Sequence, residues 1–170
     1  GLQVLRLGGA DADYVATQLT LKGAFTVEAW VKFEAPISNH DGLLAAPGRF
    51  DLNFANGQLR LWLGGELRDV VVARRKVTPG VWTHCALTRD ATGVFRIYVN
   101  GELVGTFSHD FTLDAIPNTN SDRSAIGANE GGAGSHFDGK LDEARIMIGV
   151  LSDQAVEAQY AGMIDDFVNI

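Results

Sequence analysis

The sequence has little cysteine, little proline and no long apolar run. Its 170 residues include one cysteine and four prolines. The single Cys85 excludes an intramolecular disulfide and any zinc site built from several cysteines. The longest apolar stretches, such as Val70–Ala73, are far shorter than the roughly 20 residues that a membrane-spanning helix needs. We therefore expect no membrane insertion.

An excess of positive charge is also missing. The chain has 14 Lys and Arg against 21 Asp and Glu, which gives a formal net charge of −7. This sign opposes the binding of nucleic-acid phosphates and anionic lipid, which requires a basic surface. The one basic run, Arg74–Lys76, is short and isolated. We expect no nucleic-acid partner, and an acidic surface suited to neutral ligands or divalent cations.

Alternation of apolar and polar residues recurs along the chain and predicts β-strands. Residues 25–33 place five apolar side chains on one face, and residues 58–63 and 94–99 follow the same pattern. The 20 glycines supply turn signals between these segments, of which Asn100-Gly101 is typical of a tight hairpin. This pattern predicts an all-β domain of two antiparallel sheets packed as a sandwich.

One helix is expected, over about Asp153–Gly162. Ser152 is a favourable N-cap, Leu151 and Val156 have the spacing of a hydrophobic staple, and Gly162 fits a C-terminal stop. For the tail Asp165–Ile170 there are two alternatives: it pairs as an edge strand, or it is an unattached end. We find no linker or repeat, so residues 1–170 are expected to form one domain.

Three segments resemble a known family: FTVEAWVK at 25–32, the stretch from Gly80 to Val104 with WTHCALTRD and YVNGELV, and FDGKLDEARI at 137–146. Together they are similar to the laminin-G-like, concanavalin A-like jelly-roll domains. The resemblance spans nearly the whole chain and implies a jelly-roll β-sandwich with one short C-terminal helix. It implies the function less closely, because this fold carries lectins, glycan-binding modules, glycosidases and adhesion modules.

Catalysis is not expected. Glycosidases of this fold carry paired carboxylates on one strand face, in an E-x-D-x-x-E motif that this sequence lacks. Asp142 and Glu143 are neighbours on an expected strand and would point to opposite faces. The same alternation separates His84 from Cys85, and Cys85 is expected to be a buried, unreactive thiol.

Calcium is the candidate structural ion. The family often holds one calcium between the N-terminal segment and the Asp of its "I-D-E-V" strand, which corresponds to Asp142. The further acidic candidates are Asp11 and Asp13 near the N-terminus and Asp41 in the first long loop. Calcium binds several oxygens of this kind. The alternative is that these carboxylates are ordinary solvated surface groups.

A polar and aromatic face is the main candidate for ligand binding. If the apolar residues of the middle strands face the core, the alternating residues face outward together. Aromatic planes stack on sugar rings, while amides, carboxylates and guanidinium groups bind hydroxyls. The residues that combine these groups are Asp51, Asn53, Arg60, Trp62, His84, Arg96 and Tyr98. The alternatives are packing against another element, or a ligand site in rim loops around Asn39–Asp41 and Asn118–Arg123.

The sequence therefore predicts a non-catalytic, lectin-like carbohydrate-binding module of a secreted or cell-surface protein. Its start at Gly1 fits a mature form or a module of a longer chain. The alternative is a protein–protein adhesion module of a larger extracellular protein, using a rim loop or an edge strand.

Overall fold

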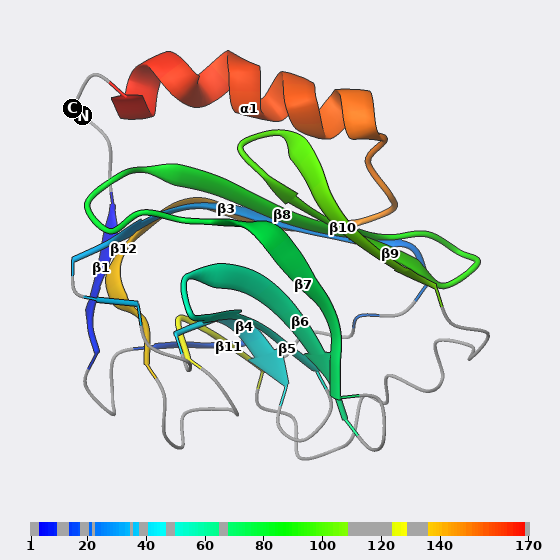
Figure 1. Ribbon diagram of the computed structural model, residues 1–170, viewed down its shortest axis with the longest axis horizontal. Coiled ribbons are helices and arrows are strands. Elements are labelled where there is room, and N and C mark those ends of the chain that lie inside the picture. Colours follow the sequence, from blue (N-terminus) through cyan, green and yellow to red (C-terminus); the bar gives the residue numbers. More distant parts are fainter. Residues whose placement is uncertain are drawn as a thin grey trace.

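The computed structural model describes residues 4–9, 14–17, 21, 23–34, 36–37, 41–46, 50–64, 68–108, 124–128 and 136–168. In these described residues, twelve strands form two antiparallel six-stranded sheets, and one helix follows them (Figure 1). Sheet I has the order β1 (Leu5–Gly8), β12 (Asp138–Ile148), β3 (Phe25–Phe33), β8 (Thr83–Arg89), β9 (Val94–Val99) and β10 (Glu102–Ser108). Sheet II has the order β2 (Val15–Thr17), β11 (Ser124–Ile126), β4 (Gly42–Ala46), β5 (Phe50–Ala55), β6 (Gln58–Leu63) and β7 (Arg68–Lys76). The expected jelly-roll sandwich is confirmed.

The core lies between the sheets and follows the predicted alternation. The predicted core-facing positions of residues 25–33, 58–63 and 94–99 are all at most 3% exposed. Aromatic rings interlock across the layer, with Phe33 meeting Phe54 edge-on at a centroid distance of 4.8 Å. The predicted hairpin also forms, since Asn100 and Gly101 have φ values of 52° and 76°, as this type of turn requires.

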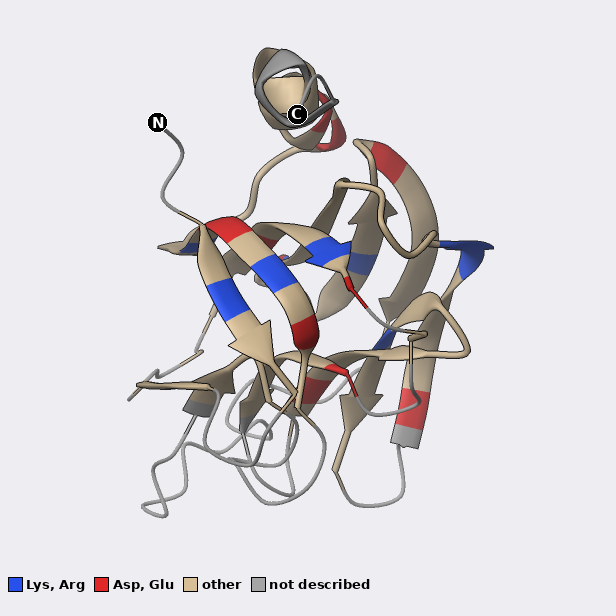
Figure 2. Cartoon of the chain, turned by 90° about the vertical axis from the view of Figure 1, so that its left-hand side faces the viewer, with Lys and Arg blue, Asp and Glu red and all other residues tan. Residues whose placement is uncertain are grey.

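The C-terminal helix α1 (Asp153–Val168) lies along the outer face of sheet I (Figures 1 and 2). Ser152 caps it, because its Oγ accepts a hydrogen bond from the Ala155 N–H at 3.2 Å. The helix continues past Gly162, so the predicted stop there is wrong, and so is a strand in the tail. Met163 and Ile164 of the extra turns pack on Trp30 and Trp82. This burial offsets the cost of a mid-helix glycine, which is about 1 kcal/mol.

Helix α1 has a consequence for sheet I: β3 and β8 are buried on both faces. Thr26, Glu28 and Trp30 point away from the sandwich core, yet each is at most 1% exposed. Every residue of β8 is buried as well. The outer face of sheet I over β3 and β8 is therefore a second, partly polar interior rather than an open surface.

Candidate functional site

The seven predicted ligand residues do not share one face. Asp51 and Asn53 of β5 and Arg60 and Trp62 of β6 belong to sheet II. The other three belong to β8 and β9 of sheet I and face the opposite side of the sandwich: His84, Arg96 and Tyr98. The prediction of a single outward face is wrong, because alternation defines the outer side of a strand but not the sheet that the strand joins.

His84 and Tyr98 are buried beneath α1. The His84 ring lies 5.5 Å from the ring of Trp30 and 6.2 Å from that of Tyr160, centroid to centroid. The Tyr98 hydroxyl donates to Asp153 Oδ1 at 2.8 Å, at the first turn of the helix. Both side chains are fully buried. They hold the helix on the sheet and are out of reach of an external ligand.

Glu28, the acidic member of this buried layer, was not among the predicted site residues. It is 1% exposed, and its Oε2 lies 3.5 Å from His84 Nε2. Arg145 Nη1 reaches its other oxygen at 3.4 Å and also donates to Gln159 of the helix. Because a buried carboxylate needs charged or hydrogen-bonding partners, these contacts tie β3, β8 and β12 to α1. Alternation alone would have placed Glu28 in solvent.

Arg96 is paired within its own hairpin. Its Nη1 lies 3.1 Å from Asp90 Oδ2, and Asp90 Oδ1 accepts hydrogen bonds from Thr92 and from the Val94 N–H. Burial raises the pKa of Asp90, but the hydrogen bonds from Thr92, Val94 and Arg96 outweigh it and lower the pKa to about 2. Arg96 thus helps to order the β8–β9 turn.

On sheet II the predicted polar residues do come together. Asn53 Nδ2 donates to Asp51 Oδ2 at 2.6 Å, and Arg60 Nε donates to Asn53 Oδ1 at 2.8 Å. Arg60 Nη1 then donates to Asp69 of β7 at 3.2 Å. This chain of hydrogen bonds runs across β5, β6 and β7 on the outer face of sheet II. It fixes the Arg60 guanidinium in one orientation.

Asp69 was not predicted as a site residue, although the register places it directly opposite Trp62. Accessibility rises along this row of the sheet. Asp51 is 5% exposed, Trp62 is half-buried, and the Asp69 side chain is 47% exposed. The accessible part of the face therefore lies over β6 and β7, where Trp62, Arg60 and Asp69 meet, while Asp51 and Asn53 support it from β5.

The predicted calcium residues do not assemble around Asp142 in the part of the chain that the structure describes. Asp142 Oδ1 accepts the Glu143 N–H at 2.7 Å, and its register partner is Trp30 of sheet I. Asp41 instead accepts the Asp138 N–H at 3.4 Å, four residues or roughly 13 Å along β12. Asp11 and Asp13 lie outside the described residues, as do Asn39 and the Asn118–Arg123 loop. Within the described ranges no group of three or more metal-ligating side chains occurs, and calcium binding at Asp142 stays a prediction.

The remaining reactive groups have structural roles. Cys85 is fully buried on the core face as expected, and burial raises the pKa of its thiol far above the usual range. Asp142 and Glu143 straddle a bulge in β12, where Glu143 has φ of 50°. The Glu143 carboxylate pairs with Arg145. The bulge explains why simple alternation did not describe this segment.

The amino-acid sequence matches the model of a known protein family. The model of the concanavalin A-like lectin/glucanases superfamily matches residues 7–157. The chain belongs to this superfamily. No curated protein sequence matches this chain significantly. Among the described residues, no helix has both the length and the apolar character to cross a bilayer.

Three solved structures illustrate the likeness, each too distant in sequence to show more than the fold. The CBM40 module of the Ruminococcus gnavus IT-sialidase, solved with sialyllactose, has a TM-score of 0.78 at 18% identity, covering 93% of this chain and 96% of that one. Domain 4 of the extracellular arabinanase AbnA of Geobacillus stearothermophilus, solved with arabinotriose, has 0.65 at 21%, covering 91% and 85%. A Bacteroides ovatus protein assigned a carbohydrate-binding role has 0.68 at 21%, covering 85% of this chain and 43% of its own length.

Proposed function

We propose that this superfamily member is a non-catalytic carbohydrate-binding module whose site is the outer face of sheet II over β6 and β7. The observation that carries the proposal is the fixed Arg60 guanidinium beside a half-buried Trp62. An indole plane covers the C–H face of a sugar, and an oriented guanidinium and carboxylate bind its hydroxyls. The carbohydrate-binding domains that share the fold support this proposal.

The charges of this face favour a neutral saccharide. Among the described residues of the network, Asp51 and Asp69 carry negative charge and only Arg60 is positive. Because Arg60 is already paired with Asp69, a carboxylate of an acidic sugar would meet a net negative surface. Arabinotriose, seen with the arabinanase domain, is a neutral ligand of the expected kind. We further propose an extracellular location, as for that arabinanase.

The test is a glycan array that carries neutral and sialylated saccharides, followed by calorimetry of the best hit with matched arginine variants. Arg60 and Arg96 are both partly buried and each pairs with one aspartate. Arg60→Ala should weaken binding by roughly tenfold or more, whereas Arg96→Ala, on the other sheet, should leave affinity unchanged. An array with only sialylated hits would contradict the neutral site, and equal effects of the two variants would contradict its location.

Trp62 gives a second measurement of the same site. Trp62→Ala should weaken the hit by roughly tenfold, since a stacked aromatic residue contributes on the order of 1–3 kcal/mol, while Trp62→Phe should retain most of the affinity. The melting temperature should change little, because the indole fills no part of the core. Wild-type affinity in Trp62→Ala would place the ligand elsewhere.

A further inference from the structure

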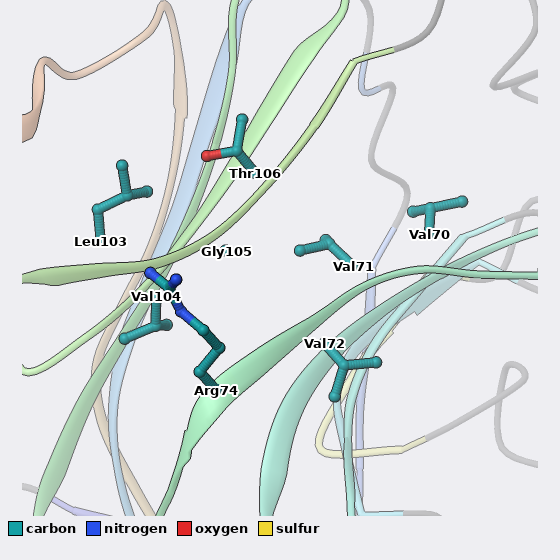
Figure 3. Close-up of a pocket in the computed structure, with 8 residues that line it drawn as sticks. All are labelled: Val70, Val71, Val72, Arg74, Leu103, Val104, Gly105 and Thr106. Atoms are coloured by element: carbon teal, nitrogen blue, oxygen red, sulfur yellow. The ribbon is translucent and has the colours of Figure 1, made fainter.

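We propose that the groove between β7 and β10 binds an extended acidic peptide, which adds to the edge of β7 as a further strand. These two strands are the terminal members of sheet II and sheet I on the same side of the sandwich. A groove of about 450 Å³ runs along their contact, and Val70, Val72, Arg74, Leu103 and Val104 are among its lining residues (Figure 3). This interaction is independent of the glycan site.

The geometry of the groove suits a strand. At its floor the two strands are in contact, since a Cβ added to Gly105 would lie 2.6 Å from Val71 Cγ2. Arg75 of β7 also pairs with Glu102 of β10 at 3.2 Å. A shift in register between Leu103 and Gly105 marks a bulge in β10 at the same point. Strand β7 has nine residues, which exceeds the five or six of a typical strand. Within the described chain β6 is the one strand that pairs with β7, so the backbone groups of its other edge that β10 does not cover can pair with a peptide.

The side chains specify the partner's pattern. Along the outer face of β7, Val72 is followed by Arg74 and Lys76, and all three are exposed. Figure 3 shows Arg74 extending from β7 towards Val104 of β10. Cross-strand neighbours of a cation are most favourable when they are acidic. A peptide with acidic residues alternating with apolar ones would meet Arg74 and Lys76 with one set and, with the other, Val71 and Val104 on the inner side of the groove.

The basic groups of β7 differ from those at the opposite side of sheet I. There Arg6 and Lys140 lie side by side on β1 and β12 (Figure 2), and Glu34 binds both, at 2.8 Å and 3.3 Å. Neither Arg74 nor Lys76 has a carboxylate within ion-pair distance among the described residues. In a protein of net charge −7, these two cations form a local site for a partner's acids.

Other occupants fit the groove less well. A second copy of the chain, paired edge to edge, would bring the same basic residues of β7 close to one another and be repelled. A saccharide would find no aromatic ring, carboxylate or amide side chain among the lining residues, which are the groups that sugar recognition uses. A peptide strand uses what the groove offers, namely backbone edges, apolar side chains and cations.

The experiment uses a fluorescein-labelled peptide of about ten residues with alternating valine and glutamate, titrated against the ¹⁵N-labelled protein. Anisotropy should show binding that weakens with added salt. Amide shifts should concentrate in residues 68–76 and 102–108. Arg74→Glu combined with Lys76→Glu should weaken binding by roughly tenfold or more. The matched control is Arg6→Glu, an exposed arginine on the distant edge strand β1, which should have no effect.

A second peptide keeps the test decisive if the β7 variant fails to fold. Proline in place of alternate valines removes backbone donors and should abolish binding to the wild-type protein. Equal binding of the proline peptide, unchanged affinity in the β7 variant, or amide shifts outside the two strands would each overturn the proposal. An oligogalacturonate that shifts these amides when the peptide does not would assign the groove to an acidic saccharide instead.

Discussion

Tyr98 joins the sandwich to the helix through one hydroxyl group. Its Oη donates to Asp153 Oδ1 at 2.8 Å and lies 3.5 Å from Thr88 Oγ1. Burial raises the pKa of Tyr98 to about 12, and the adjacent Asp153 carboxylate contributes in the same direction. Since the folded pKa exceeds the unfolded value of 10.0, this group stabilises the fold fully below pH 10 and loses the contribution as the pH rises through 12.

We therefore expect Tyr98→Phe to lower the free energy of unfolding by about 1 kcal/mol at neutral pH, the usual cost of one buried hydrogen bond. The difference from the wild type should shrink between pH 10 and 12, where the wild-type hydroxyl ionises. Urea unfolding at a series of pH values measures both quantities. A difference that stays constant through this window would contradict the role given to the hydroxyl.

At the scale of an element, the β8–β9 hairpin depends on Asp90. Its carboxylate accepts hydrogen bonds from the Thr92 hydroxyl at 2.6 Å and from two backbone N–H groups, and it pairs with Arg96. A carboxylate whose folded pKa is about 2, against 3.8 for the free group, contributes stability above pH 3.8. The contribution is lost as the pH falls through 2.

Asp90→Asn should thus lower the free energy of unfolding by up to about 2 kcal/mol at pH 7. The amide keeps the shape and one acceptor oxygen but loses the charge. Melting curves recorded from pH 6 downwards should converge with those of the wild type as the pH approaches 2. If the two proteins differ by the same amount at pH 6 and pH 2, the stabilisation does not come from the ionised carboxylate.

At the scale of the whole molecule, the sandwich separates stability from binding. The outer face of sheet I is sealed by α1 over His84, Trp30 and Tyr160, whereas the outer face of sheet II exposes part of Trp62. Stacked sheets lie about 10 Å apart. Residues on the two outer faces share no partners, and their substitutions should act independently.

His84→Ala should lower the free energy of unfolding by about 2 kcal/mol, through the cavity left under the helix, and leave the affinity for the array hit unchanged. Trp62→Ala should do the reverse. In the double variant, the two stability changes should add within about 0.5 kcal/mol. Weaker glycan binding by His84→Ala alone would show that the two faces are coupled and would contradict this division.

The sequence by itself determined much of the local structure. Period-two alternation identified the core residues of β3, β6 and β9, since a strand with one face towards a core must bury every second side chain. Asn100-Gly101 predicted its hairpin because few residues adopt positive φ twice in succession. Ser152 predicted the start of α1 from the hydrogen bond that its side chain can accept.

Tertiary structure alone decided which outward residues meet and which are covered. His84 and Trp62 have the same local pattern, yet one lies beneath α1 and the other on an accessible face. Asp69 joins Arg60 only because β7 pairs with β6. These outcomes depend on strand order and on the docking of a helix distant in the sequence, and a strand's own alternation carries no information about either.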